Sequence, residues 1–383
     1  MQYIGGNRLT LLRNGEQYFP ALVAAIDAAK REVFLESYIY ADDETGSLVT
    51  DALARAAARG VRVRLLIDGF GARDFAPRWR QALRNAGAEV LTFRPEFARL
   101  RLRRGRLRRM HRKLAAIDGA TAFVGGINII DDFDSPAERR PRHDYAVRVE
   151  GPLAVDVRAA AARLWRSVAR AAMRRGAPLL LPPPAPLPAG DQRAALVIRD
   201  SWRHRSDIED AYLAYIHSAR RDIVIACAYF FPGRRFRRAI VAATARGVRV
   251  RLLLQGKIEY ALVHYASRAL YGVLLDAGIE IHEYHRSLLH AKVAVFDERV
   301  ACVGSSNIDP LSLLLAREAN IFIDDATFAQ QLCRSLEEAM LTGGARLAPR
   351  QWRRQSLLMR LRMWLDYGIA RSLINLFGLE RYH

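Results

Sequence analysis

The stretch MHRKLAAIDGATAFVGGIN at residues 110–128 decides the fold, because the chain repeats its pattern as LHAKVAVFDERVACVGSSN at residues 289–307. In each copy a lysine follows the first histidine after two residues, an aspartate after seven and an asparagine after seventeen. The matched positions are His111, Lys113, Asp118 and Asn128 in the first copy, and His290, Lys292, Asp297 and Asn307 in the second. A repeat of this kind predicts two copies of one structural unit.

Composition shows that the repeat is not a coincidence. With nine His and four Lys in 383 residues, chance supplies only about 0.01 copies of His-x-Lys-x4-acid. The chain carries its positive charge almost entirely on arginine, and its only lysines are Lys30, Lys113, Lys257 and Lys292. Half of them lie at the same place in the two copies, which indicates that a compact ammonium group is needed there.

Each copy begins with an alternating apolar run that is typical of a β-strand. Residues two apart on a strand face the same side, so the histidine and lysine of each copy project together. The aspartate follows at the end of the strand, where Asp118-Gly119 is also typical of a turn. A turn role and a contact with substrate are therefore both open for the aspartates. Gly126 and Ser305 would let an anion approach the chain closely.

The pattern resembles the phospholipase D superfamily, in which two such motifs from two halves of one chain form a single site. The resemblance implies a phosphoryl transfer without metal or cofactor, in which one histidine attacks phosphorus and the other protonates the leaving oxygen and then activates the acceptor. The lysines and asparagines would hold the non-bridging oxygens. The expected catalytic residues are His111, Lys113, Asp118, His290, Lys292 and Asp297, and the expected phosphate-binding residues are Gly126, Asn128, Ser305 and Asn307.

An acidic residue follows each copy of the repeat. Asp144 lies in HDYAVRVEGP at residues 143–152, and Glu318 lies in REANIFI at residues 317–323. An acid at either place could accept the second ring N–H of a catalytic histidine and fix its tautomer. The resemblance implies this role more firmly for Glu318 than for Asp144, and an ordinary surface ion pair is the alternative for both.

Strand-like and helix-like segments alternate in both halves of the chain. The first half predicts strands at residues 8–13, 33–40, 61–67 and 89–93 with helices between them, and ARGVRVRLL at residues 58–66 recurs at 245–253. The expected fold class is therefore α/β, with two pseudo-equivalent halves, each a mixed, mostly parallel sheet flanked by helices, and one active site between them. The expected division is 1–176, a proline-rich linker at 177–191, 192–345, and a basic, partly amphipathic tail at 346–383.

The net charge of +20 and a pI near 10.6 indicate an anionic partner, and on charge alone nucleic acid and an acidic membrane are both open. Arginines alternate with Phe and Leu through residues 93–110, which favours a segment lying on anionic lipid. The expected membrane contacts are Arg101, Arg103, Arg104 and Arg106. A solvated loop and a nucleic-acid clamp are the alternatives. Leu and Ile at helical spacing in the tail fit either an interfacial helix or one packed on the core.

The cysteines show no metal-ligand spacing, and the N-terminal residues lack the pattern of a signal peptide. No run of eighteen uncharged apolar residues occurs. We therefore expect a peripheral protein on the cytoplasmic side of the inner membrane, with reduced, buried thiols.

The resemblance narrows to the cardiolipin synthases, in particular their shorter B type, through RRMHRKLAAID, FVGGIN, HDYAVRVEGP, LLHAKVAVFD and VGSSNIDPLSL. It implies a membrane-associated phosphatidyl transferase that uses phosphatidylglycerol as donor and acceptor. We assign His111 as the nucleophile and His290 as the acid, an assignment that the sequence itself leaves open. The alternatives are a phospholipase D-type hydrolase, a phosphatidylglycerol synthase using phosphatidylethanolamine, a nuclease, and a scaffold with a dead site. Apolar residues among the arginines argue against a nucleic-acid partner. The sequence predicts no oligomeric state.

Overall fold

The computed structural model describes residues 1–95, 108–133, 141–172, 186–200, 204–309, 312 and 316–376. The first half contains β1 (Ile4–Arg13), α1 (Asn14–Asp27), β2 (Glu32–Ser37), α2 (Glu44–Ala58), β3 (Arg62–Asp68), α3 (Pro77–Asn85), β4 (Glu89–Phe93), β5 (Lys113–Ile117), β6 (Thr121–Gly125), β7 (Tyr145–Glu150) and α4 (Leu153–Ala171). The order of elements confirms an α/β fold.

The second half repeats this order, with two helices in the place of α3 and with a further strand and two further helices after the element equivalent to α4. It contains β8 (Gln192–Arg199), α5 (Asp207–Ser218), β9 (Asp222–Cys227), α6 (Arg234–Ala245), β10 (Arg249–Gln255), α7 (Ala261–Arg268), α8 (Tyr271–Asp276), β11 (Glu280–Tyr284), β12 (Lys292–Phe296), β13 (Val300–Gly304), β14 (Glu318–Asp324), α10 (Ala326–Gly343), β15 (Gly344–Arg346), α11 (Pro349–Arg353) and α12 (Leu357–Leu376).

The strands of both halves form one 15-stranded mixed sheet in the order β15-β11-β10-β9-β12-β13-β14-β8-β1-β7-β6-β5-β2-β3-β4. Among these strands only β2-β3-β4 and β9-β10-β11 run parallel, and the other neighbours pair antiparallel. The expectation of mostly parallel sheets is therefore wrong. The physical reason is that β5 and β6 are joined by only three residues, and a parallel connection needs a dozen or more.

Strand β1 joins the two halves, because it pairs antiparallel with β7 on one side and with β8 on the other. Asn7 of β1 is fully buried at this junction, where its side-chain oxygen accepts the backbone N–H of Leu153 and its amide nitrogen donates to the carbonyl of Ile4. The first residues of the chain are therefore part of the contact between the halves.

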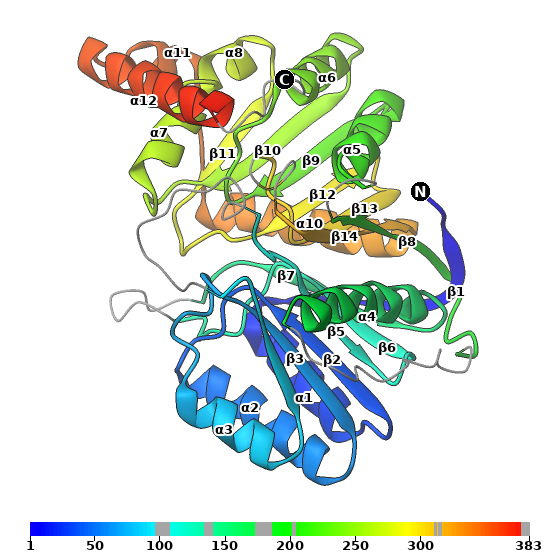
Figure 1. The fold of residues 1–383 in the computed structure, drawn as a ribbon. Helices are drawn as coiled ribbons and strands as arrows, with labels where there is room; N and C mark the ends of the chain where they lie inside the picture. The colour runs from blue at the N-terminus through cyan, green and yellow to red at the C-terminus, as the bar shows by residue number, and fades with distance from the viewer. Residues whose placement is uncertain are drawn as a thin grey trace.

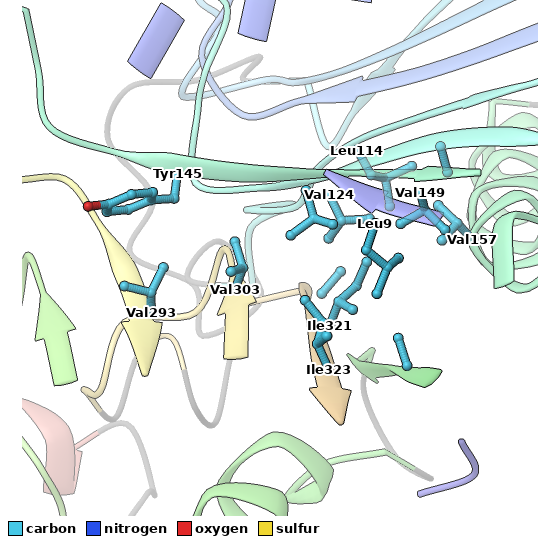
Figure 2. Close-up of a cluster of buried hydrophobic side chains, with 14 of the residues drawn as sticks. Leu9, Leu114, Val124, Tyr145, Val149, Val157, Val293, Val303, Ile321 and Ile323 are labelled. Atoms are coloured by element: carbon cyan, nitrogen blue, oxygen red, sulfur yellow. The ribbon is translucent and has the colours of Figure 1, made fainter. Parts of the chain in front are cut away.

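Helices cover the outer faces of the sheet, and α4 and α10 lie between the halves (Figure 1). Strands buried on both faces separate alternate residues into different cores, as expected for covered sheets. In β5, Leu114 and Ala116 belong to the core that the two halves share, whereas Ala115 and Ile117 belong to the core under α1 and α2. Figure 2 shows Leu9 and Val124 of the first half facing Val303 and Ile321 of the second in the shared core.

The repeated ARGVRVRLL segment has the same structure in both halves. It begins at the end of a helix, where Gly60 and Gly247 take the left-handed backbone conformation with φ of 87° and 85°. Glycine adopts this conformation without steric cost, so it ends α2 and α6 and turns the chain into β3 and β10.

Some predicted features lie outside the described residues, namely Arg101, Arg103, Arg104, Arg106 and most of the proline-rich segment. The tail forms α11 and α12, and α12 packs on α7 while Leu357, Leu358 and Leu361 stay exposed on it. None of the helices in the described part of the chain is long and apolar enough to cross a bilayer.

Candidate active site

The two repeated histidines lie where the halves meet, just before β5 and β12. The backbone N–H of His111 donates to the carbonyl of Arg317 at 3.0 Å, and that of His290 donates to the carbonyl of His143 at 2.9 Å. Each partner residue directly precedes the acid of the other half. Backbone pairing across the halves therefore places each histidine beside the acid that its own half does not supply.

The side chains of the two histidines also pair with residues of the other half. Nδ1 of His111 lies 2.9 Å from Oε1 of Glu318, and Nδ1 of His290 lies 2.6 Å from Oδ2 of Asp144. The two acids occupy similar places, because Asp144 directly precedes β7 and Glu318 begins β14, and these strands pair with β6 and β13 at the end of each repeat. The structure thus brings both expected acids to the two histidines, one from each half.

Both histidines are held in an orientation suited to chemistry at Nε2, since Nδ1 faces a carboxylate. Burial and Lys292 lower the pKa of His290 to about 3, against the opposing effect of Asp144. Burial also lowers the pKa of His111, and Glu318 opposes that shift. Burial alone would raise the pKa of Asp144, but Lys292 and His290 lower it below its usual value. The rings are therefore neutral at pH 7, and Asp144 is ionised.

The two lysines are buried beside the histidines. Nζ of Lys113 donates to the carbonyl of His111 at 2.7 Å, and Nζ of Lys292 donates to the carbonyl of His290. Nζ of Lys292 also lies 4.0 Å from Oδ2 of Asp144. Burial lowers the pKa of Lys113 to about 7 and lowers that of Lys292 as well. Such ammonium groups are poorly compensated, so an anion that arrives between them is strongly favoured.

The two asparagines are also buried, and each holds the chain after a parallel strand. Oδ1 of Asn128 accepts the N–H of Ile39 at 3.1 Å, and Oδ1 of Asn307 accepts the N–H of Tyr229 at 3.4 Å. With the oxygen engaged, the NH₂ group is the part of each amide that can donate to a phosphate.

The phosphate-binding role expected for Gly126 and Ser305 needs correction. Ser305 is fully buried, and its hydroxyl donates to Oε2 of Glu318 at 2.5 Å. A Cβ on Gly126 would lie 2.3 Å from Oδ1 of Asp144. Both residues therefore position the acid of their own half, one by a hydrogen bond and the other by leaving space for the carboxylate.

The catalytic role expected for Asp118 and Asp297 also needs correction, because both lie at the far end of their strands, about 20 Å from the histidines. The carboxylate of Asp118 accepts the backbone N–H groups of Lys30, Arg31 and Glu32 at 2.8–2.9 Å. Asp297 does the same for residues 220–222. These aspartates fix the chain that enters β2 and β9, so their equal spacing reflects the repeated fold.

Two positioning residues were missed from the sequence. Oδ2 of Asp68, at the end of β3, accepts the N–H of Met110 at 2.9 Å, and Oε1 of Gln255, at the end of β10, accepts the N–H of Leu289 at 3.3 Å. Both bonds anchor the residue just before a histidine. The available signal was the repeated ARGVRVRLL, which ends shortly before each of them.

The ring of Tyr38 lies edge-on to His111, with centroids 4.8 Å apart. No group of three or more His, Cys, Asp or Glu side chains suited to a metal ion occurs among the described residues.

Comparison with known proteins identifies the family of the chain. A family model described as the PLD-like domain of cardiolipin synthase matches residues 22–152 and again residues 212–340. The chain is 39% identical to cardiolipin synthase B of Escherichia coli K12 over 357 residues, which cover 88% of this chain and 84% of that protein. The chain belongs to the PLD-like cardiolipin synthase family. Another member, the major cardiolipin synthase ClsA of Bacillus subtilis, is 32% identical over 340 residues, which cover 88% of this chain and 69% of that protein.

The fold of this PLD-like family member also matches a solved structure. Phosphatidylserine synthase of Haemophilus influenzae superposes with a TM-score of 0.70 at 12% identity, over 95% of this chain and 93% of that one. At this identity the likeness shows the fold alone. Each of the two matches of the family model contains one copy of the repeat, at residues 110–128 and 289–307, in agreement with the two halves.

Proposed function

We propose that the protein is a cardiolipin synthase, which transfers the phosphatidyl group of one phosphatidylglycerol to the headgroup hydroxyl of another and releases glycerol. The observation that carries this proposal is the pair of partly buried histidines, each oriented by the acid of the other half at 2.9 and 2.6 Å. Two such rings supply a nucleophile and a general acid on opposite sides of one phosphorus, as in-line displacement requires. Membership of the cardiolipin synthase family supports the same activity.

In the first step Nε2 of His111 forms a bond to phosphorus, and the bond from phosphorus to the glycerol oxygen breaks. His290 gives its proton to that oxygen. In the second step the hydroxyl of the acceptor lipid gives its proton to His290 and bonds to phosphorus, and the bond to His111 breaks. Protons balance over the cycle, and His290 returns to its protonated form.

This cycle requires a charged His290, although its pKa is about 3 in the protein alone because of burial and Lys292. A phosphodiester anion between the rings and the lysines offsets both effects, because it neutralises the nearby ammonium and stabilises the imidazolium. Substrate binding and protonation of His290 are therefore coupled. An empty site holds neutral rings, and a loaded site holds the acid that the leaving group needs.

The proposal includes peripheral binding to the cytoplasmic face of an anionic membrane. A net charge of +20 favours acidic phospholipid surfaces. The exposed leucines of α12 add apolar side chains that can enter the interfacial region.

Incubation of the purified protein with labelled phosphatidylglycerol vesicles and EDTA tests the proposal. We expect equal amounts of cardiolipin and glycerol from the wild type and neither from His111→Ala or His290→Ala. His217→Ala, which removes an exposed histidine on α5, is the matched control and should keep full activity. Phosphatidic acid in place of cardiolipin would make the protein a hydrolase, and cleavage of DNA or RNA without lipid turnover would make it a nuclease.

A further inference from the structure

The ends of the equivalent strands β3 and β10 differ in a way that the repeated fold does not require. Asp68 uses its second carboxylate oxygen to accept the N–H groups of Phe70 and Gly71. Gln255 holds Leu289 with Oε1, but its Nε2 is buried and has no hydrogen-bond partner among the described residues. A buried amide without a partner is costly. The second half therefore contains a buried hydrogen-bond donor, Nε2 of Gln255, that forms no hydrogen bond among the described residues.

Gln255 lines a narrow cleft, and a group bound there could accept a hydrogen bond from its amide. Gln255, only 7% exposed, lines the cleft together with Ala228, Tyr229, Lys257, Glu259 and Tyr260. The free space is about 20 Å³, enough for one hydroxyl-sized group.

Two residues of the cleft are bonded to the chain neighbours of the acid-base histidine, His290. The N–H of Ala228 donates to the carbonyl of Ala291, directly after His290, and Gln255 holds Leu289, directly before it. Glu259 is near enough to raise the pKa of Lys292 against the larger lowering effect of burial.

The polar groups of the cleft are of two kinds. The amide of Gln255 donates, while the carboxylate of Glu259 accepts and is itself bonded to the hydroxyl of Tyr229. A phosphodiester only accepts hydrogen bonds, and its negative charge is repelled by Glu259. An ammonium only donates hydrogen bonds, and its positive charge is repelled by Lys257. A hydroxyl both donates and accepts, so it matches the lining. The equivalent place in the first half carries Phe70 under Arg109, 5.0 Å from the ring centroid, and offers no such pair.

In-line displacement adds a geometric argument. If His111 attacks phosphorus, the leaving alcohol departs on the opposite side, and the acceptor alcohol attacks from that same side. Both alcohols must therefore bind next to His290.

We infer that the cleft formed by Gln255, Tyr229 and Glu259 is the binding site for the second hydroxyl of a glycerol headgroup, first of the leaving glycerol and then of the acceptor lipid. The inference rests on the proposed function, since it assigns the alcohol side of that reaction to His290. By holding the neighbouring hydroxyl, the cleft orients the reacting one toward phosphorus and favours a polyol over water. It is thus the element that makes transfer outrun hydrolysis.

Exchange of labelled glycerol into phosphatidylglycerol vesicles measures this site directly, with 1,3-propanediol as an acceptor that lacks the hydroxyl on the carbon next to the reacting one. For the wild type we expect glycerol to be half-saturating at a concentration at least about tenfold lower than propanediol. Glu259→Gln, and Gln255→Glu, which keeps an oxygen for Leu289 but removes the donor, should abolish this preference and raise the ratio of phosphatidic acid to exchanged lipid. Glu16→Gln, an exposed carboxylate on α1, is the control for loss of one negative charge.

The outcomes separate the two proposals. If the half-saturating concentrations of glycerol and propanediol stay unchanged in both variants, the cleft is not the hydroxyl-binding site. The same conclusion follows if ethanolamine is a better acceptor than glycerol. Release of no glycerol from phosphatidylglycerol by the wild type would instead overturn the proposed function. Equal effects of both variants on glycerol and propanediol would show that they only disturb His290, which also overturns the cleft as a hydroxyl site.

Discussion

Nδ1 of His290 lies 2.6 Å from Oδ2 of Asp144, and the two residues belong to different halves of the chain. The pair His111 and Glu318 repeats this relationship in the opposite direction. One active site is therefore assembled from two incomplete ones, and neither half holds a histidine with its own acid.

Removing the charge of an acid without changing its shape tests these pairs. Asp144→Asn and Glu318→Gln should each lower kcat by about 10²- to 10⁴-fold, because the histidine loses its preferred tautomer and the stabilisation of its charged form. In Asp144→Asn the pKa of His290 falls further, so activity should decline with rising pH from a lower midpoint than in the wild type. Profiles of kcat against pH measure this. Glu338→Gln, an exposed carboxylate paired with Arg13, should leave the profile unchanged.

The crossed pairs also predict that one chain makes one complete site. A mixture of His111→Ala and His290→Ala should have no activity above that of the separate variants, measured as cardiolipin formed per total protein. Recovery of a tenth or more of wild-type activity would mean that halves of different chains exchange, and it would contradict a site formed within one chain.

Buried Lys113 should make anion binding depend on pH. Its pKa of about 7, lowered by burial, means that the ammonium is present below pH 7 and lost above it. The affinity for sulfate, whose charge is constant between pH 6 and 8.5, should therefore fall as pH rises through 7. Lys113→Arg keeps its charge over this range, so its sulfate affinity, followed by calorimetry, should stay flat. A parallel decline in both proteins would argue against Lys113.

Asp118→Asn and Asp297→Asn should affect stability and not chemistry. Each loses a charged acceptor for several backbone N–H groups, which should lower the free energy of unfolding by about 1–3 kcal/mol, while kcat stays within about threefold of wild type.

At acidic pH the wild type and Asp297→Asn should have the same free energy of unfolding. Burial tends to raise the pKa of Asp297, but its backbone N–H bonds lower it below its usual value. The stabilisation is therefore present above the unfolded pKa and lost as pH falls through the folded one. Urea unfolding of the wild type and the variant at pH 7 and near pH 3 measures the difference in stability and its loss in acid. A large loss of kcat at full stability would restore a catalytic role.

Gly126→Ala should disable His290 from a distance. The added methyl would lie 2.3 Å from Oδ1 of Asp144, so the carboxylate must move away from the ring. We expect kcat to fall by about 10- to 100-fold, as for loss of other groups that orient a histidine through its second nitrogen. Gly5→Ala, where the nearest atom lies 3.8 Å away, is the control. A Gly126→Ala variant with wild-type kcat would show that Asp144 need not stay in place.

The repeat allowed the two α/β halves and the histidines, lysines and asparagines to be located, because strand periodicity determines which neighbours share a face. It could not show that His111 meets Glu318, since spacing describes only local geometry. The aspartates were misassigned for a related reason. A constant offset from the histidine records a repeated fold, but seven residues of strand carry Asp118 out of reach of the site.

The direction of the strands and the cleft at Gln255 illustrate two further limits. The short link between Ile117 and Thr121 was a readable sign of antiparallel pairing. The unused amide of Gln255 was not readable, because a buried donor without a partner is visible only when every neighbour is known.

The crossing has a consequence for synthesis of the protein on the ribosome. When residues 1–176 have emerged, they carry His111 without Glu318 and Asp144 without His290, and β1 still waits for β8. A chain that ends before residue 290 therefore has neither histidine paired with its acid.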